Sequence, residues 1–369
     1  MDVLRRARLA AVTVVAVAVL LTLVFAAQAA STETSLTVGA IYVGSVKDAG
    51  YNQSQHDAVM EMKSRIKGVK VLETENIPET SNVESVMDKM INQGAELIFP
   101  TSFGYMDFAL KVAKKNKDVV FEHAGGYKLA SNFGTYWATA SPVSYALGVA
   151  AGKTTKTGKL GFVGAIPIPD VIGAADAFHL GAQSVNPSVK TIVIFTGSWS
   201  DPAKEASAVN TLANQKVDVV GGVVDSLITV TKTAEQRGVF VAGYWSAAAK
   251  QYAPKYWLSG ADFDWAPIIT TFARQVINDT WKSKAVKPPA QAKIVQLAPF
   301  GPKVPAAAKA AATKVMREFT TGKRTSAFVG PIYDQKGKLR VPKGKAPPAG
   351  GPFEQTITWL AKGMIGRTK

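Results

Sequence analysis

The stretch DAGYNQSQHD, residues 48–57, gathers side chains of this sequence that are suited to chemistry. It follows the apolar run of residues 36–44 and combines a carboxylate, a phenol, amides and an imidazole. His56 beside Asp57 could move a proton in general acid–base catalysis. Tyr51 could instead stack on a flat ligand while neighbouring polar groups bind the ligand's edge. The third alternative is a polar loop that opens a helix and whose short side chains cap it.

Recognisable catalytic motifs are missing elsewhere in the chain. The three histidines are far apart, and the absence of cysteine excludes thiol catalysis and cysteine-ligated metals. The GKT of residues 152–154 resembles the end of a phosphate-binding loop, but Leu147 stands where that loop needs its first glycine. Asp48, Asp225 and Asp264 could pair for acid–base work, although no spacing requires it. We therefore expect a protein that is not an enzyme and that has no cofactor and no metal site.

Apolar, strand-like stretches alternate with amphipathic, helix-like stretches along the chain. This alternation predicts the elements that position the candidate side chains. From residue 37 to about 150 the pattern is β-α-β-α-β-α-β, and after the polar joint KTTKTGK it repeats up to about residue 260. Asp201-Pro202 begins one of the later helices with a capping side chain followed by proline. In the C-terminal part we expect a hairpin in GPIYDQKGKLRVPKG and a short last helix over residues 356–362.

This pattern predicts an α/β fold with two similar doubly wound domains, each containing a parallel sheet. The expected first domain is 36–150 plus about 262–292, and the second is 155–260 plus about 293–369. A multi-strand hinge would join them around a ligand cleft. Because ligands of such sheets bind beyond the carboxyl ends of the strands, the candidate site residues are those that follow strands. These segments are 48–55, 101–106, 122–126, 166–170, 197–201, 225–226, 244–246 and 262–265.

Aromatic residues are frequent in these segments after the strands. A flat ligand would use such rings for stacking, with a few polar side chains at its edge, whereas other rings would only cover the sheet ends. The rings concerned are Tyr51, Phe103, Tyr105, Trp199, Trp245 and Trp265.

The two ends of the chain differ sharply from its middle. Residues 1–29 have three arginines, an apolar stretch and a small-residue cleavage site, which is typical of a secretory signal peptide. Since no cysteine is present for lipid attachment, a soluble periplasmic protein is expected. The net charge is +16, and residues 282–369 are strongly basic. These lysines lack aromatic interleaving, so we expect a solvated basic face or a docking surface for an acidic partner, and no nucleic-acid binding.

The stretch DAGYNQSQHD resembles the D-x-G-[FYW]-N-x-S pattern of the basic membrane protein family, which consists of substrate-binding proteins of ABC importers. Asp48, Gly50, Tyr51, Asn52 and Ser54 match this pattern. The resemblance extends over nearly all of residues 36–270 and to the closing hairpin. Its further motifs are LIFPTSFGYMD, YALGVAAG, GKLGFVGAIPIP, GAQSVNPSVK, GSWSDPAKEA, DVVGGVVDS and DQKGKLRVPKG.

The resemblance implies a type I periplasmic binding fold and a purine ligand, since characterised members bind purine nucleosides. It further implies that Tyr51 and Trp199 sandwich the base, that Asp48 and Asn52 bind its edge, and that Phe103 lines the floor. The implied partners are a small purine-like molecule and an ABC permease of the inner membrane. We expect the protein to be a monomer.

Two departures from the family pattern bear on the ligand. In GYWSAAAK, Trp245 stands where the family has a carboxylate that holds ribose hydroxyls, and LSGADFDW replaces a segment that carries a lysine. Buried hydroxyls without partners are costly, so the sequence favours a bare purine-like base such as adenine. Asp225, Trp245 and Asp264 complete the expected site. The alternatives are a nucleoside receptor of the same family, an exported nucleoside hydrolase using Asp48 and Asp225, and an interaction protein that uses the basic tail.

Overall fold

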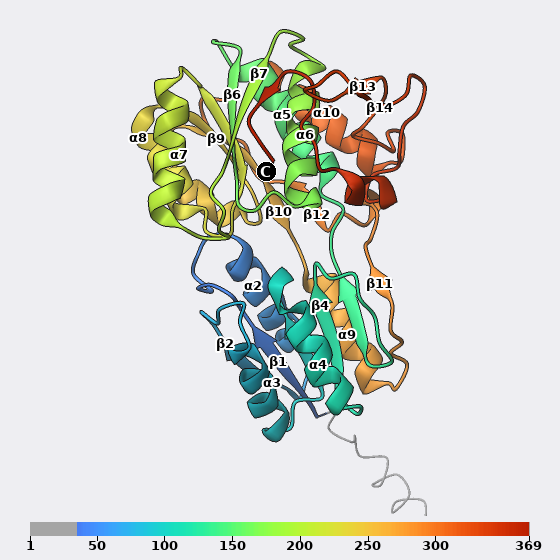
Figure 1. Cartoon of the computed structure of the whole chain (residues 1–369). Helices are drawn as coiled ribbons and strands as arrows, with labels where there is room; N and C mark the ends of the chain where they lie inside the picture. The colour runs from blue at the N-terminus through green and yellow to red at the C-terminus, as the bar shows by residue number, and fades with distance from the viewer. Residues whose placement is uncertain (1–34, 369) are drawn as a thin grey trace, which may run out of the picture.

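The computed structural model describes residues 35–368, which form two α/β units joined end to end (Figure 1). The first unit contains a six-stranded sheet in which every neighbouring pair is parallel. Its strands, in spatial order, are β11 (Ala285–Val286), β5 (Phe133–Tyr136), β4 (Val120–Ala124), β3 (Leu97–Pro100), β1 (Leu36–Ile41) and β2 (Val69–Thr74).

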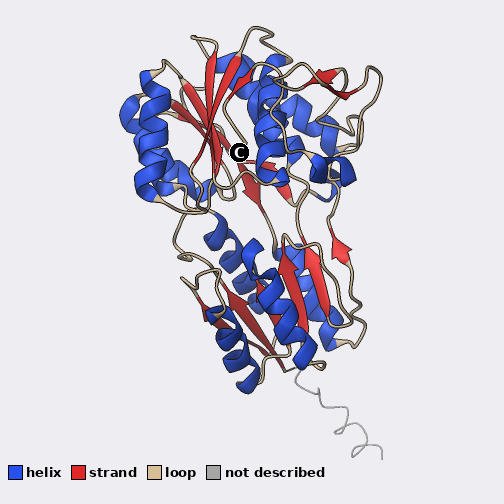
Figure 2. Cartoon of the chain, in the orientation of Figure 1, coloured by secondary structure: helices blue, strands red, loops and turns tan. Residues whose placement is uncertain are grey.

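Helices flank this sheet (Figure 2). Their buried residues recur at the spacing of a helix face. In the second of them Val83, Met87 and Met90 are buried, and its exposed positions are polar. The last helix of the unit comes from far along the chain and packs against the first. The helices are α2 (Tyr51–Arg65), α3 (Asn82–Asn92), α4 (Met106–Lys115), preceded by the 3₁₀ turn η1 (Phe103–Tyr105), and α9 (Ala266–Ile277).

The second unit contains a seven-stranded sheet that is parallel except for one antiparallel pair, β10 with β12. The strands, in spatial order, are β12 (Val295–Leu297), β10 (Trp257–Phe263), β9 (Phe240–Gly243), β8 (Val219–Val223), β6 (Lys159–Gly164), β7 (Lys190–Phe195) and β15 (Met364–Ile365). The predicted α/β fold with two similar sheet-based halves is confirmed. The antiparallel β12 and the short β15 are additions that the alternation did not predict.

Two helices of the second unit approach so closely that glycine is required between them. A β-carbon at Gly148 of α5 (Ser141–Thr154) would lie 1.9 Å from the backbone oxygen of Phe178 in α6 (Pro169–Gln183). One at Gly181 would lie 2.0 Å from the backbone oxygen of Tyr145. The other helices are α7 (Pro202–Asn214), α8 (Ile228–Arg237), the 3₁₀ turns η2 (Ala247–Tyr252) and η3 (Ala290–Ala292), and α10 (Ala306–Thr320).

The helix start predicted at Asp201-Pro202 is confirmed. The Asp201 side chain accepts a hydrogen bond of 3.1 Å from the backbone N–H of Lys204, and α7 begins at Pro202.

The C-terminal segment confirms one prediction and contradicts another. The hairpin is present as β13 (Ile332–Tyr333) and β14 (Leu339–Val341). The helix predicted over 356–362 is wrong, because only the 3₁₀ turn η4 (Pro352–Thr356) forms and the chain then runs extended into β15. Helix α6 holds this segment: Asp176 accepts from the backbone N–H of Ala361 at 2.9 Å. These tertiary hydrogen bonds override the local helical pattern.

Three stretches of chain connect the two sheets, and they are hydrogen-bonded to their neighbours. They lie between β5 and α5, between β10 and α9, and between β11 and β12. The backbone N–H of Trp137 donates to Val286 at 2.9 Å, and that of Asp264 donates to Ile294 at 2.8 Å. Within residues 35–368 no helix has the length and apolarity to cross a membrane. The predicted leader, residues 1–29, lies outside the described residues.

Candidate ligand-binding site

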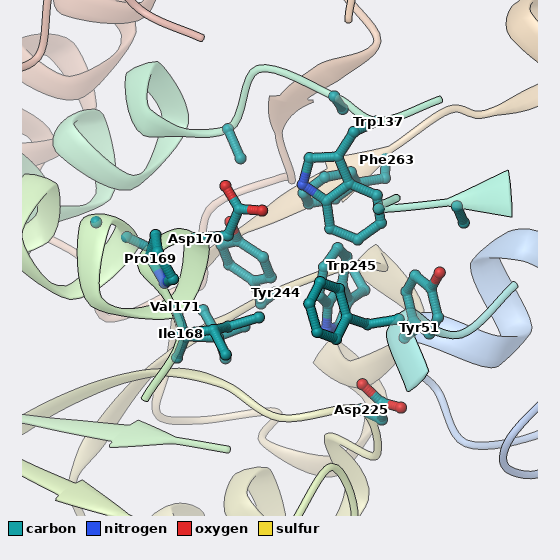
Figure 3. A pocket seen from close by; sticks show the side chains of 18 of the residues that line it. Tyr51, Trp137, Ile168, Pro169, Asp170, Val171, Asp225, Tyr244, Trp245 and Phe263 are labelled. Atoms are coloured by element: carbon teal, nitrogen blue, oxygen red, sulfur yellow. The ribbon is translucent and has the colours of Figure 1, made fainter. Parts of the chain in front are cut away.

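A cavity lies between the two units and is lined by residues of both (Figure 3). It contains about 820 Å³ of space, including its open mouth. Most of its lining comes from segments that follow strands, as expected for ligand sites of parallel sheets. The position therefore agrees with a cleft that binds a small molecule.

Three rings of the cavity pack against one another across the boundary between the units. Tyr51 begins α2, Trp137 follows β5 and Trp245 follows β9. The ring centroid of Tyr51 lies 4.8 Å from that of Trp245 and 6.1 Å from that of Trp137, and the two tryptophans are 5.7 Å apart. The Tyr51 hydroxyl donates to the backbone oxygen of Thr101, and the Trp245 indole N–H donates to that of Val224 at 3.0 Å. With these polar tips satisfied, the rings offer apolar surface to a ligand.

Tyr244 and Phe263 extend this aromatic wall. Both ring centroids lie 4.7 Å from that of Trp245, and Phe263 also stacks on Trp265 at 5.2 Å. Trp245 itself has φ of 69°, a backbone conformation that is uncommon outside glycine. This conformation has an unfavourable backbone energy, and residues with such conformations cluster at functional sites. Its occurrence at Trp245 therefore agrees with a ligand site in this cavity.

Two further rings line the cavity nearer to solvent. Phe103 belongs to η1 and is 36% exposed, and Trp199 lies between β7 and α7. The indole nitrogen of Trp199 is buried and has no hydrogen-bond partner among residues 35–368. A buried donor of this kind needs a partner, and a polar ligand atom would supply one.

Asp225 is a buried acid of the cavity and lies two residues after the end of β8. Burial raises the pKa of its carboxyl well above the ordinary value, and the charges of Asp48, Glu79 and Glu205 raise it further. Its backbone oxygen accepts a hydrogen bond of 3.0 Å from the N–H of Tyr51, which ties the two units together at the cavity. Figure 3 shows the side chain beside the aromatic group. It can bind an N–H or O–H of a ligand.

A second polar group lines the cavity and consists of Asp170, Lys287 and Glu354. The Lys287 ammonium lies 3.9 Å from Asp170 Oδ1 and 3.9 Å from Glu354 Oε2, which is too long for a hydrogen bond. Burial raises the pKa of Glu354, whereas the hydrogen bond from Ser141 and the charge of Lys287 lower it. Asp170 begins α6, Lys287 lies in a connecting stretch and Glu354 belongs to η4.

The structure brings five of the eight predicted site residues to the cavity wall. They are Tyr51, Phe103, Trp199, Asp225 and Trp245. The rings of Tyr51 and Trp199 face the same cavity from different units, but Tyr51 packs on Trp137 and Trp245. A base sandwiched between Tyr51 and Trp199 therefore stays a prediction.

Asp48, Asn52 and Asp264 are not among the lining residues. Asp48 accepts backbone N–H bonds from Gly50 at 2.8 Å, Asn52 at 3.0 Å and Gln53 at 3.1 Å, and it also accepts the Asn52 amide. Asp48 thus caps the start of α2, and its burial raises its pKa. Asp264 is exposed and accepts from Ala266 at the start of α9. Asp48 and Asp264 thus accept backbone N–H groups at helix starts, while the Asn52 amide is bonded to Gly44 and Asp48. The contact of Asp48 and Asn52 with a base edge, and the role of Asp264 in binding, stay predictions.

His56, which suggested catalysis, also lies outside the lining. Its Nδ1 is 2.8 Å from Glu73 Oε1, and the side chain is partly exposed. The pairing agrees with a residue in the first turns of α2.

Several lining residues were not singled out from the sequence. Asp170, Tyr244 and Phe263 fall within the segments after strands, so the strand-end rule contained the signal for them. Trp137 was missed because the four-residue β5 before it was not recognised. Lys287 and Glu354 come from the irregular C-terminal part, and no local pattern indicates that these two residues meet Asp170.

Comparison with known proteins identifies the family. The family model of the ABC transporter substrate-binding protein PnrA-like group, Bmp, matches residues 35–326. A purine-binding protein of Brucella abortus is 38% identical over 311 residues, which cover 84% of this chain and 87% of that protein. An ABC transporter nucleoside-binding protein of Lactococcus lactis is 29% identical over 173 residues, 47% of each chain.

Solved structures agree on the fold. A solute-binding protein of an ABC transporter system from Conexibacter woesei superposes with a TM-score of 0.63 at 20% identity, covering 78% of this chain and 97% of the other. A solute-binding protein of an ABC transporter system from Aeropyrum pernix gives 0.67 at 17% identity, covering 81% and 93%. The match to the family model over residues 35–326, together with the identity to the Brucella protein, shows that this chain belongs to the Bmp family of PnrA-like ABC transporter substrate-binding proteins.

Proposed function

We propose that the protein binds a purine-like base, adenine or a related flat heterocycle, and delivers it to an ABC permease. The observation that carries this proposal is the aromatic wall of the cavity with the buried carboxyl of Asp225 beside it. Flat heterocycles gain from stacking on such rings, and a carboxyl accepts their N–H groups. The Brucella relative is a purine-binding protein, which agrees with this ligand class, whereas the Lactococcus relative is a nucleoside-binding protein and agrees with the alternative of a nucleoside receptor.

A base is favoured over a nucleoside by the surroundings of Trp245. The indole is 4% exposed, packs on Tyr244 and Phe263, and gives its only N–H to Val224. It therefore fills volume and offers no acceptor to a sugar hydroxyl, which would be costly to bury unpaired.

We further propose that the protein is not an enzyme. A hydrolase that uses Asp48 and Asp225 would need both carboxyls at the ligand. Asp48 is engaged by four hydrogen bonds at the start of α2 and does not line the cavity. We also propose that the protein acts in the periplasm as a monomer, after residues 1–29 have been cleaved off.

Titration calorimetry of the purified protein with adenine, guanine, xanthine, adenosine and inosine tests the proposal. We expect at least one base to bind more tightly than either nucleoside. Tighter binding of a nucleoside than of all three bases would instead support the nucleoside receptor. Incubation with inosine is the second arm, in which release of free base at enzymatic rates would contradict the non-catalytic function.

A further inference from the structure

The cavity has polar groups at two separate places, with rings between them. Figure 3 shows Asp225 on one side of Trp245 and Tyr244, and Asp170 on the other side. Asp225 lies in the loop two residues after β8, and Asp170 is the second residue of α6. A flat ligand stacked on the rings would have one edge near each carboxyl.

The group around Asp170 keeps unused hydrogen-bonding capacity. Asp170 Oδ1 accepts from Gln355 at 3.2 Å, and no bond to Oδ2 is formed by residues 35–368. The Lys287 ammonium has no acceptor within hydrogen-bond distance in that part of the chain, although it is largely shielded from solvent with 22% of its side chain exposed. The ammonium therefore attracts both carboxylates but forms no hydrogen bond with either, so its N–H donors remain available to a ligand atom.

We propose that Asp170, with Lys287 beside it, binds the edge of the base opposite Asp225 and selects a base whose imidazole nitrogen carries hydrogen. This inference rests on the proposed function and deepens it. Adenine has N–H donors at two edges, the exocyclic amine and the imidazole N–H, and ring nitrogens between them accept hydrogen bonds. Two carboxyls on opposite sides, with an ammonium near one, match that arrangement. A substituent at the imidazole nitrogen removes the donor and leaves the partly shielded carboxylate of Asp170 without its partner.

The direct test is calorimetry of the whole protein with adenine, 9-methyladenine and adenosine. The methyl group removes the donor and adds no hydroxyl. We expect 9-methyladenine to bind about tenfold or more weakly than adenine, because the carboxylate of Asp170 loses the N–H that it would accept. Equal affinities of adenine and 9-methyladenine would overturn this inference and leave the proposed function intact. Tighter binding of adenosine, through sugar hydroxyls at Asp170 and Lys287, would overturn both this inference and the preference for a base. If none of several purines binds, the proposed function fails as well.

The variant Asp170→Asn tests whether this side chain makes the distinction. We expect the ratio of adenine to 9-methyladenine affinity to fall toward one in D170N. The matched control is Asp88→Asn, which changes an exposed aspartate of α3 outside the cavity and should keep the wild-type ratio. A wild-type ratio in D170N would contradict the assignment. A general loss of stability in D170N would lower both affinities and would not by itself change their ratio. If D170N does not fold, the comparison of the three ligands on the wild-type protein still tests the inference.

Discussion

At the scale of single residues, the ligand site consists of aromatic rings and acidic side chains that differ in how deeply they are buried. Phe103 and Asp225 illustrate the two extremes. Phe103 is 36% exposed and belongs to a 3₁₀ turn, so its ring can be removed at small cost to the fold. Asp225 is buried and carries a raised pKa, so its protonation and its role in binding are inseparable.

Replacing Phe103 by alanine should weaken binding of the base without unfolding the protein. The lost ring contact is expected to cost about 1 kcal/mol, which is roughly a fivefold rise in Kd. Calorimetry with the best-bound base measures it, and Tyr127→Ala is the matched control because Tyr127 is 69% exposed and outside the cavity lining. An unchanged Kd in the Phe103 variant would remove this ring from the site.

Glu122 of β4 should make stability depend on pH. Burial raises its pKa to about 8, although the hydrogen bond from Trp281 and the charge of Lys284 oppose the shift. The folded state therefore holds a proton that the unfolded state loses near pH 4.5, and stability falls as pH rises from about 4.5 to about 8.

We expect Glu122→Gln to abolish this contribution, which has a slope of up to about 1.4 kcal/mol per pH unit. Urea unfolding at pH 6 and pH 9 measures it: the wild type should lose stability relative to the variant at the higher pH. The control Glu96→Gln changes an exposed residue of the same unit and keeps Glu122, so its stability should depend on pH as that of the wild type does. Parallel losses in the wild type and in E122Q would exclude the proposed titration.

At the scale of elements, close backbone contacts decide which residues are allowed. Helices α5 and α6 pack with almost no side chain between them at Gly148 and Gly181. In an isolated helix, alanine is preferred over glycine by about 0.5–1 kcal/mol. Packing should reverse that preference here, because the added methyl group has no space.

Gly148→Ala is expected to destabilise the protein by about 1–3 kcal/mol, since α6 must move away from the new methyl group. Gly173→Ala in α6 is the matched control: its β-carbon would meet only Ile357 at an ordinary 3.5 Å. Thermal melting of both variants measures the effect. Equal stabilities of G148A and G173A would contradict the close approach of α5 and α6 at Gly148.

The elements were predictable from sequence where their signal is local. Met106–Lys115 and the start of α7 at Pro202 follow from periodicity and capping, which depend on residues a few positions apart. Trp137 was not predictable as a site residue because β5 before it has only four residues. Glu354 reaches the cavity through tertiary contacts of the C-terminal segment, and no local rule contains them.

The same distinction holds for the predicted binding residues. Tyr51, Trp199 and Asp225 were found because each follows a strand of a parallel sheet. Asp48 and Asn52 have residue types that suit both capping and ligand binding. Only the geometry of α2 shows that their polar atoms are already engaged.

At the scale of the whole molecule, the backbones of the two units come into close contact beside the cavity. Gly50 lies against the backbone oxygen of Asp225, to which a β-carbon at position 50 would come within 1.8 Å. The next residue, Tyr51, donates its backbone N–H to the same oxygen. The contact joins two segments that also line the cavity, so unit orientation and ligand contact are coupled.

Gly50→Ala should hold the two units apart while each keeps its own fold. We expect binding of the base to weaken about tenfold or more, because residues from both units must surround it. Calorimetry and small-angle X-ray scattering measure the outcome, with an unchanged far-UV circular dichroism spectrum as the control for folding. Wild-type affinity together with a wild-type radius of gyration would show that the contact does not govern the arrangement.

The contribution of the C-terminal segment to the cavity wall has a consequence for when, during synthesis, the site becomes complete. The cavity wall includes both Tyr51 and Glu354, which are 354 − 51 = 303 positions apart in the sequence. A nascent polypeptide that has not been synthesised as far as residue 354 therefore lacks part of the wall of the site. Ligand binding by the complete wall requires both segments, so it cannot precede synthesis of the segment that contains Glu354.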